Sequence, residues 1–176
     1  MNQNPKPLTE LISDYTVALD LIDRADRHSI PTPSDPKKTG VIDLKYEDFV
    51  RDIDELREEL DLGELFAQDN NNGLESILKS INQSYDNKPL YPTAESKAAN
   101  LLYLIIKNHP FVDGNKKVAS FAFVRYLDLN GLLYREDGTK RIEGNTLVAT
   151  ALLLAQSNTK DKDLMISLVM YLIKME

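Results

Sequence analysis

The N-terminal part of the chain contains one helical pattern followed by a proline-rich stretch. From Thr9 to Arg27, apolar residues recur at the 3.6-residue period that places them on one face of a helix: Leu11, Ile12, Tyr15, Ala18, Leu19 and Ile22. Residues 28–40 contain Pro31, Pro33 and Pro36, which cannot propagate a helix, so a surface loop is expected there. We expect residues 1–45 to pack, as a helix and a proline-rich loop, on a domain formed by residues 46–176, with both in one structural unit.

Two further helical patterns follow the proline-rich stretch. The first has apolar residues at Tyr46, Phe49, Val50, Ile53, Leu56 and Leu60, and its outer face is the charged run 51–59, typical of a solvated surface. A turn at 70–73 precedes a short helix marked by Leu74, Ile77, Leu78 and Ile81. Residues 84–92 then break helicity, because they include Asp86, Asn87, Pro89 and Pro92.

The most apolar helices come next and are expected to form the core. Thr93 is a good N-cap for a helix over 94–107, and Gly131 can end a second helix over 115–130 in a left-handed conformation. Both segments are apolar nearly all round, which indicates burial. Segments 147–155 and 164–173 supply two closing helices, while 132–138 could form at most a small hairpin. The predicted fold class is all-α: a compact helical bundle around two buried central helices.

Composition narrows the class of protein further. The 176 residues, 42% of them hydrophobic, suffice for one core, and the absence of cysteine excludes disulfides, thiolate metal sites and a cysteine nucleophile. A net charge of −7 argues against nucleic acid as a partner, because phosphate backbones require clustered Lys and Arg. No apolar run reaches the roughly 18 residues needed to span a bilayer, so we expect no membrane partner and a cytoplasmic location.

Candidate chemistry lies between the two predicted central helices, in the sequence His109-Pro110-Phe111-Val112-Asp113-Gly114-Asn115-Lys116-Lys117. A helix N-terminus presents unpaired N–H groups and partial positive charge, so Lys116 and Lys117 are unfavourable there unless an anion binds. Gly114 permits the backbone turn that converges N–H groups on a phosphate, and Asn115 can add its amide. Asp113 is a hard oxygen ligand suited to Mg²⁺, and the His109 imidazole suits proton abstraction.

The same nine residues resemble the signature of the Fic/Doc superfamily. That signature is H-x-F-x-[DE]-G-N-G-R-x-x-R in the adenylylating branch and H-x-F-x-D-[AG]-N-K-R in the death-on-curing branch. The segment 91–99, Tyr-Pro-Thr-Ala-Glu-Ser-Lys-Ala-Ala, is similar to the one preceding the motif in the second branch and in RhuM-type virulence proteins. The likeness extends over about Tyr46 to Ile173 and is nearest to this second branch.

The resemblance implies a compact Fic-type helical domain with ATP and Mg²⁺ as cofactors. It implies that His109 acts as general base on a Ser, Thr or Tyr hydroxyl of a target protein, that Phe111 anchors the loop, and that Asp113 holds Mg²⁺. It also implies a catalytic set of His109, Asp113 and Lys117 and a phosphate site of Gly114, Asn115, Lys116 and Lys117. A hairpin flap that docks the target would comprise Asp86, Asn87, Lys88, Pro89, Leu90 and Tyr91.

Departures from the signature leave two functions open. Lys116 replaces a glycine of the adenylylating branch, Lys117 an arginine of both branches and Ser120 the last arginine of the first. Because lysine lacks the bidentate fork of arginine, these changes weaken the expected grip on phosphates. The first function is ATP- and Mg²⁺-dependent transfer of phosphate or AMP to a protein hydroxyl, as a toxin or regulator with an antitoxin or inhibitory partner. The alternative is a catalytically degenerate Fic-fold module that binds nucleotide or protein.

Overall fold

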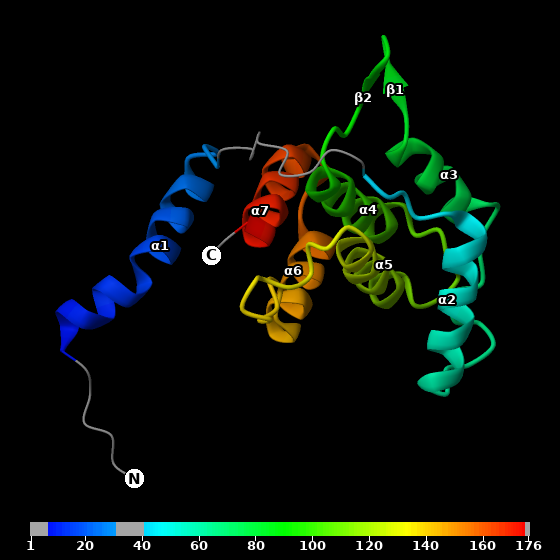
Figure 1. Ribbon diagram of the computed structural model, residues 1–176, viewed down its shortest axis with the longest axis horizontal. Coiled ribbons are helices and arrows are strands. Elements are labelled where there is room, and N and C mark those ends of the chain that lie inside the picture. Colours follow the sequence, from blue (N-terminus) through cyan, green and yellow to red (C-terminus); the bar gives the residue numbers. More distant parts are fainter. Residues whose placement is uncertain (1–6, 31–40, 175–176) are drawn as a thin grey trace.

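The structure is a computed structural model that describes residues 7–30 and 41–174 (Figure 1). Helices make up most of this described part, and the single sheet is a two-stranded antiparallel hairpin, which confirms the predicted all-α fold class. The elements are α1 (Leu8–Asp26), α2 (Tyr46–Glu59), α3 (Gly73–Ile81), β1 (Ser84–Tyr85), β2 (Lys88–Pro89), α4 (Ala94–Asn108), α5 (Asn115–Leu129), α6 (Gly144–Gln156), the short 3-10 helix η1 (Thr159–Asp161) and α7 (Lys162–Lys174).

Helices α4 and α5 form the centre of the domain, as the sequence predicts. All residues from Thr93 to Tyr103 are buried, and α5 buries Val118, Ala119, Ala122, Phe123, Tyr126 and Leu127. Helices α3, α6 and α7 pack against α4, and α6 also packs against α5 (Figure 1). The apolar composition of α4 and α5 therefore follows from their position, since both are covered on several sides.

The N-terminal end of α4 is held by a capping box. Thr93 Oγ1 accepts a hydrogen bond from the Ser96 backbone N–H at 3.1 Å, and Ser96 Oγ accepts one from the Thr93 N–H at 3.1 Å. Two donors that would otherwise be unpaired at the helix start are thus satisfied by side chains. This confirms the N-cap predicted at Thr93.

A polar cluster around the buried Lys97 ties the segment before α2 to this end of α4. The Lys97 side chain, about one-tenth exposed, donates to Asp43 Oδ1 at 2.7 Å and to Asn82 Oδ1 at 2.8 Å. The Tyr126 hydroxyl donates to the same Asp43 oxygen at 3.2 Å, and burial, followed by the nearby Asp43 charge, raises the pKa of Tyr126. We name Asp43, Asn82, Lys97 and Tyr126 the Lys97 cluster. It fixes residues 41–45 on the domain, where Leu44 is buried.

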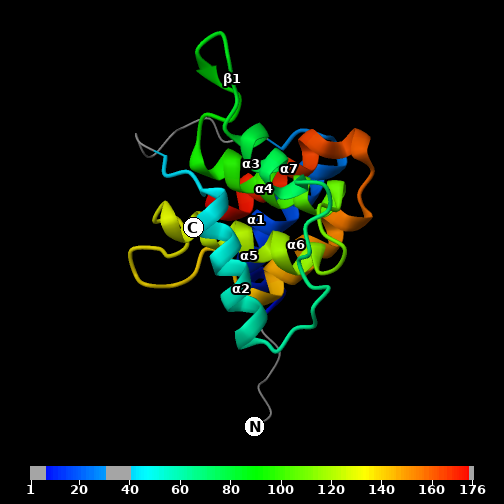
Figure 2. The same cartoon turned by 90° about the vertical axis from the view of Figure 1, so that its right-hand side faces the viewer.

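The hairpin β1–β2 lies before the N-terminus of α4. Ser84 pairs with Pro89 and Tyr85 with Lys88, and the two turn residues between the strands have positive φ angles of 50° and 58°. That conformation is typical of the tight turns that match strand twist. The hairpin projects beyond the helices in both views (Figures 1 and 2). In the predicted hairpin region 132–138, the structure has one isolated bridge, between Tyr134 and Lys140.

Helix α1 leaves most of its described large apolar side chains exposed. It extends outward from the neighbourhood of α7 (Figure 1), and its large apolar side chains at Leu8, Ile12, Val17, Leu19 and Ile22 are all more than half exposed. Near its end, His28 Nε2 lies 4.0 Å from Asp161 Oδ1. Residues 41–45 thus contact the domain, whereas the five apolar side chains of α1 named above are exposed. The boundary at residue 45 stays a prediction, and the predicted proline-rich loop lies mostly outside the described residues.

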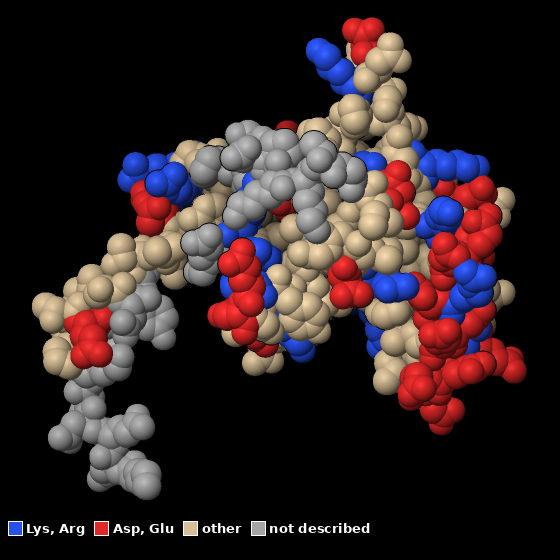
Figure 3. Space-filling view, viewed as in Figure 1, with Lys and Arg blue, Asp and Glu red and all other residues tan. Residues whose placement is uncertain are grey.

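The outer face of α2 carries the charges that the sequence places there, and acidic side chains dominate it in Figure 3. Arg51 pairs with Asp48 on exposed surface, and the partly buried Arg57 pairs with the exposed Asp54, each pair one turn apart. Such pairs contribute little to stability. None of the helices within 7–30 and 41–174 has the length and apolar composition needed to cross a membrane.

Candidate active site

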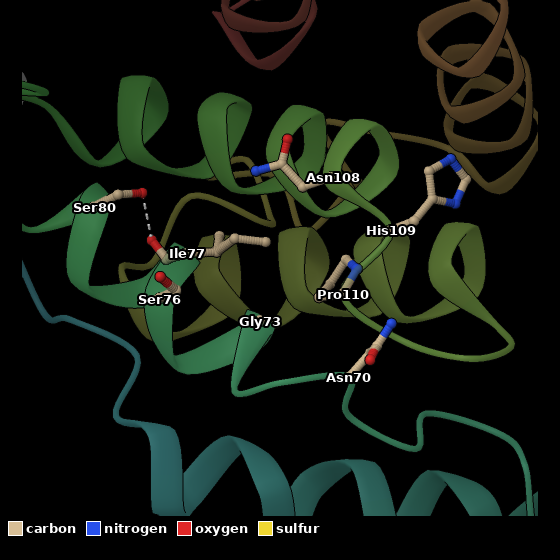
Figure 4. Close-up of a pocket in the computed structure, with 8 residues that line it drawn as sticks. All are labelled: Asn70, Gly73, Ser76, Ile77, Ser80, Asn108, His109 and Pro110. Carbon is tan, nitrogen blue, oxygen red and sulfur yellow. Dashed lines mark hydrogen bonds between the residues drawn. The ribbon is translucent and has the colours of Figure 1, made fainter.

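The candidate histidine stands at the point where α4 ends. His109 is the C-cap of α4 and adopts a left-handed backbone conformation, with φ 48° and ψ 58°. Non-glycine residues reach this region at a cost, and such strain concentrates at functional sites. The imidazole is exposed and has no hydrogen-bond partner among the described residues. Figure 4 shows the ring directed away from Ser76 and Asn70, so its nitrogens are open to a reactant.

The loop after His109 is closed by the side chain of Asn115. Asn115 Oδ1 accepts a hydrogen bond from the Phe111 backbone N–H at 2.9 Å, and Asn115 Nδ2 donates to the Phe111 carbonyl oxygen at 2.8 Å. The Phe111 side chain is buried at 3% exposure, as the resemblance implies for a loop anchor. The Asn115 amide therefore first shapes the loop, while the sequence suggested that it faces a phosphate.

The start of α5 offers unpaired backbone donors. Gly114 is the N-cap with φ 81°, no side chain caps this end, and the first intrahelical bond runs from the Val118 N–H to the Gly114 carbonyl at 2.9 Å. The N–H groups of Asn115, Lys116 and Lys117 thus precede the helical ladder. The first turn has no acidic residue, and both lysines are exposed. Helix dipole and lysines together make this end a strong attractor for an anion.

A segment between α2 and α3 runs along the motif loop and holds it in place. Three backbone hydrogen bonds join the two: Ala67 N–H to the Asp113 carbonyl at 3.0 Å, Val112 N–H to the Gln68 carbonyl at 2.9 Å and Asn70 N–H to the Pro110 carbonyl at 2.7 Å. We name residues 66–70 the supporting segment. It gives the motif loop the rigidity of a paired strand, although it is irregular itself.

Phe66 is the residue of this segment that sequence reasoning missed. Its side chain is 4% exposed, and a Cβ added to Gly114 would lie 2.4 Å from its ring carbons. Gly114 is therefore required twice, for its positive φ and for the close approach of the ring. Lys117 Nζ lies 5.6 Å from the ring centroid, which offsets part of its unfavourable position. The signal in the sequence was the short apolar stretch 65–67 inside a polar loop.

The structure does not bring the predicted flap to the motif. Residues 86–91 precede the N-terminus of α4, whereas His109 follows its C-terminus. A helix of 15 residues is about 22 Å long, so the two lie at opposite ends of α4. The structure therefore does not place residues 86–91 beside His109, and their docking role stays a prediction. The segment that lies along the motif loop is the supporting segment.

Two hollows flank the motif loop. On one side, a cleft of about 350 Å³ is lined by Asn70, Gly73, Ser76, Ile77, Ser80, Asn108, His109 and Pro110 (Figure 4). On the other side, a groove between α5 and α6 is lined by Lys116, Lys117, Ser120, Leu147, Val148, Ala151 and Leu152. We name the second the α5–α6 groove. The first is lined mostly by uncharged polar groups, and the second combines an apolar floor with two lysines.

Asp113 is the carboxylate of the motif loop that could contribute to a metal site. Within the described ranges, no group of three or more His, Asp or Glu could hold a metal ion. The Asp113 side chain is exposed and accepts no hydrogen bond from another described residue, while its backbone carbonyl is bound by Ala67. Mg²⁺ is commonly bound by one or two carboxylates together with substrate phosphates. Asp113 therefore fits a metal ion shared with a nucleotide, and not one held by the protein alone.

Comparison with known proteins agrees with the motif and its setting. Residues 43–127, from the Lys97 cluster through most of α5, match the family model described as Fic/DOC family. The same comparisons found no matching curated protein and no matching solved structure. The match covers the motif loop, the supporting segment, α4 and most of α5. It supports assignment of this segment to the Fic/Doc superfamily, and a Fic-type transferase or nucleotide-binding module as its general class.

Proposed function

We propose that the chain transfers a phosphate-containing group from ATP to a hydroxyl side chain of a target protein. The observation that carries the proposal is the start of α5. Three unpaired N–H groups, a left-handed Gly114 and two exposed lysines adjoin one exposed histidine, with no acidic residue in the first helical turn to compete for the cations. This arrangement suits an anion next to a proton acceptor.

In this proposal the phosphates of ATP lie against the N–H groups of Asn115, Lys116 and Lys117. The lysine side chains add mobile positive charge, and the positive φ of Gly114 turns the chain so that these N–H groups begin the helix. Asn115 contributes its backbone N–H, because its side chain is engaged with Phe111. Lys117 contributes less than an arginine would, since its ammonium sits over the Phe66 ring and offers no fork.

His109 accepts the proton of the target hydroxyl. The hydroxyl oxygen then forms a bond to phosphorus while the bond from that phosphorus to the bridging oxygen breaks, and the remaining part of ATP leaves with the electron pair. The free imidazole suits this role, because both of its nitrogens lack protein partners among the described residues. Mg²⁺ bound with the phosphates would supply charge neutralisation, and Asp113 is the residue that would hold it.

Within this class, we favour phosphate over AMP as the transferred group. Lys116 stands in the first turn of α5, where the adenylylating signature has a glycine, and Ser120 replaces its last arginine. The β- and γ-phosphates thus lose two contacts that would turn the α-phosphorus toward the hydroxyl. The death-on-curing branch, which the motif resembles in having Asn-Lys, is understood to place the γ-phosphate toward the histidine.

The experiment that tests this proposal compares ATP labelled at two different phosphates. The protein is incubated with Mg²⁺ and ATP labelled at either the α- or the γ-phosphate, in a bacterial lysate, and labelled proteins are then separated. Label from γ-ATP alone supports phosphorylation, and label from α-ATP alone changes the assignment to AMP transfer. The His109→Asn variant is the matched control, because Asn tolerates the left-handed conformation found at residue 109.

Nucleotide binding measured in parallel separates the two general classes. Calorimetry that detects Mg²⁺-dependent ATP binding without any label transfer would assign the chain to the degenerate, nucleotide-binding class. The Asp113→Asn variant should weaken binding in the presence of Mg²⁺ and leave binding without Mg²⁺ unchanged, because only the metal link is removed. Absence of ATP binding by the wild-type protein would contradict the proposal altogether.

A further inference from the structure

We propose that two copies of this chain form a symmetric dimer in which α1 of each copy docks in the α5–α6 groove of the other. The inference rests on two exposed apolar surfaces of the same chain and is tested without the transfer reaction. Because Lys116 and Lys117 also line this groove, the docked helix and the phosphates of ATP would compete for these two lysines. Exchange of a terminal element between identical chains is a known, low-cost route to a closed dimer.

The first surface is a stripe along α1. Leu8, Ile12, Leu19 and Ile22 are 72%, 52%, 54% and 60% exposed. Their spacings of four, seven and three residues place them on one face of the helix. We name these four residues the α1 stripe. Side chains that are neither basic nor acidic predominate along the middle of α1 in Figure 3.

An apolar stripe of this length is costly in isolation. A helix that exposes apolar side chains over several turns normally gains its stability by burying them, because short helices are marginal in water. Exposed apolar patches of this kind are typical of interaction sites. The described part of the same chain does not cover the stripe, since α1 extends away from the domain (Figure 1).

The second surface is the α5–α6 groove and the exposed face of α6 beside it. Val148 and Leu152 line the groove, one helical turn apart, and are 60% and 52% exposed. Leu153, next to Leu152, is 45% exposed. The floor between them includes Leu147 and Ala151, with Ala151 buried. A helix with an apolar face fits such a groove through side chains at positions i, i+3, i+4 and i+7.

Charge supports the match between these two surfaces. The charged residues that line the groove are Lys116 and Lys117, both basic. By sequence, α1 contains five acidic residues and one basic residue, Arg24: the acidic ones are Glu10, Asp14, Asp20, Asp23 and Asp26. Arg24 pairs with Asp20 and Arg27 pairs with Asp23, so acidic charge still exceeds basic charge along the helix. Asp26 follows Ile22 by four residues and so lies beside the stripe. An acidic helix with an apolar face therefore complements a groove with an apolar floor and a basic rim.

Exchange of α1 in both directions doubles the contact area between the two copies, and a stable dimer needs a large contact area. A helix of 19 residues is about 28 Å long, and one such contact is small for a lasting interface. Twofold symmetry provides the contact twice, because each copy has both surfaces. For this reason a second copy of the chain, and not an unrelated helix, is the occupant that the structure favours.

The first experiment measures the mass of the full chain by sedimentation equilibrium. We expect twice the 20.0 kDa chain mass for the wild type. Ile12→Asp in the stripe and Leu152→Asp in the groove should each shift the distribution to the monomer. Val17→Asp is the matched control, because Val17 is equally exposed but lies on the opposite face of α1 and should leave the dimer intact. A monomeric wild type, or equal effects of all three changes, would overturn the proposal.

The second experiment locates the contact with cysteines, which the natural sequence lacks. Leu19→Cys and Leu152→Cys are made in separate chains, mixed and oxidised, and the products are separated by mass without reductant. We expect a disulfide-linked dimer of one chain of each kind, and little product when Val17→Cys replaces Leu19→Cys. If the mixture gives no mixed dimer while the double variant closes a disulfide within one chain, α1 covers its own groove and the inference is wrong.

Discussion

The two ends of α4 contrast sharply in how their polar groups are satisfied. At the N-terminal end, Thr93 and Ser96 cap the helix, and Lys97 has two hydrogen-bonded oxygen partners. At the C-terminal end, His109 is strained, exposed and unpartnered among the described residues. The next helix begins there without a side-chain cap. Both ends are rich in polar residues, so polarity alone does not tell them apart.

Whether a polar group already has hydrogen-bond partners within the protein distinguishes residues that stabilise the fold from residues that can bind a ligand. A buried polar group with all its partners present stabilises one arrangement and offers nothing to a ligand. An uncapped helix start with two lysines is unfavourable, offset in part by the contact of Lys117 with the Phe66 ring, and it gains stability when an anion binds. We therefore expect the Lys97 cluster to stabilise the fold and the motif loop to bind the reactants. Substitutions in the two regions should then affect different properties of the protein.

The largest effect is expected at His109. His109→Ala should lower the rate of transfer to protein by about 10²–10⁴-fold, because the proton of the attacking hydroxyl loses its acceptor. ATP binding should be unchanged, since the phosphates contact the start of α5 and not the imidazole. The measurement is single-turnover transfer from labelled ATP with calorimetry on the same sample. Loss of ATP binding together with activity would give His109 a different role.

Gly114 should show the largest effect on stability. Gly114→Ala is expected to cost about 2–4 kcal/mol, the sum of a left-handed alanine and an overpacked contact with Phe66. Gly138→Ala is a matched control: its φ of 83° nearly equals the 81° of Gly114, but nothing lies within 4 Å of the added carbon. Urea unfolding of both variants should differ by about 1–3 kcal/mol, which is the contact alone. Equal losses of stability in the two variants would show that the contact with Phe66 does not contribute.

Much of this fold follows from the sequence because the signals are local. The helical period at 46–60 and 74–81, the Thr93 cap and the apolar character of 94–107 and 115–130 each depend on neighbouring residues only. The structure places helices at all of these positions. The motif loop was also found from sequence, because its residues are adjacent in the chain.

The parts that sequence missed depend on contacts between distant segments. Phe66 and Gly114 are 48 positions apart, and nothing in either neighbourhood indicates that they touch. The same holds for Asp43 with Lys97, which lie 54 residues apart. The hairpin at 84–89 is visible locally through Asn87 and Pro89, but its distance from His109 depends on the length and direction of α4. Propensity cannot supply such information, because it describes single elements.

A smaller loss of stability is expected when the Lys97 cluster is broken. Asp43→Ala should cost about 1–3 kcal/mol, because the nearly buried Lys97 ammonium keeps only Asn82 and the Tyr126 hydroxyl loses its acceptor. The transfer rate of the folded variant should be unchanged, which is the opposite of the result for His109→Ala.

Asp54→Ala is the control for Asp43→Ala. The Asp54 side chain is exposed and pairs with Arg57 one turn away, and Arg57 keeps its hydrogen bond to the Phe66 carbonyl when Asp54 is removed, so the loss should change stability by less than about 1 kcal/mol. Urea unfolding of both variants at one pH provides the comparison. If the two aspartates prove equivalent, the Lys97 cluster contributes no more than a surface pair, and the contrast between the two ends of α4 weakens.

The smallest effect concerns the two lysines at the start of α5. Lys116→Glu should raise the free energy of unfolding of the ATP-free protein by about 0.3–1 kcal/mol, because a negative charge suits a helix N-terminus. Lys117→Glu should gain less, since it also loses the contact of Lys117 with the Phe66 ring, worth about 0.5–1 kcal/mol. Unfolding at low ionic strength measures both, and the gain should fade in high salt. Addition of ATP and Mg²⁺ should stabilise the wild type but neither variant, because each puts a carboxylate where the phosphates are proposed to bind. A Lys116→Glu protein that ATP still stabilises would place the nucleotide away from α5, and the proposed chemistry at the C-terminal end of α4 would lose its basis.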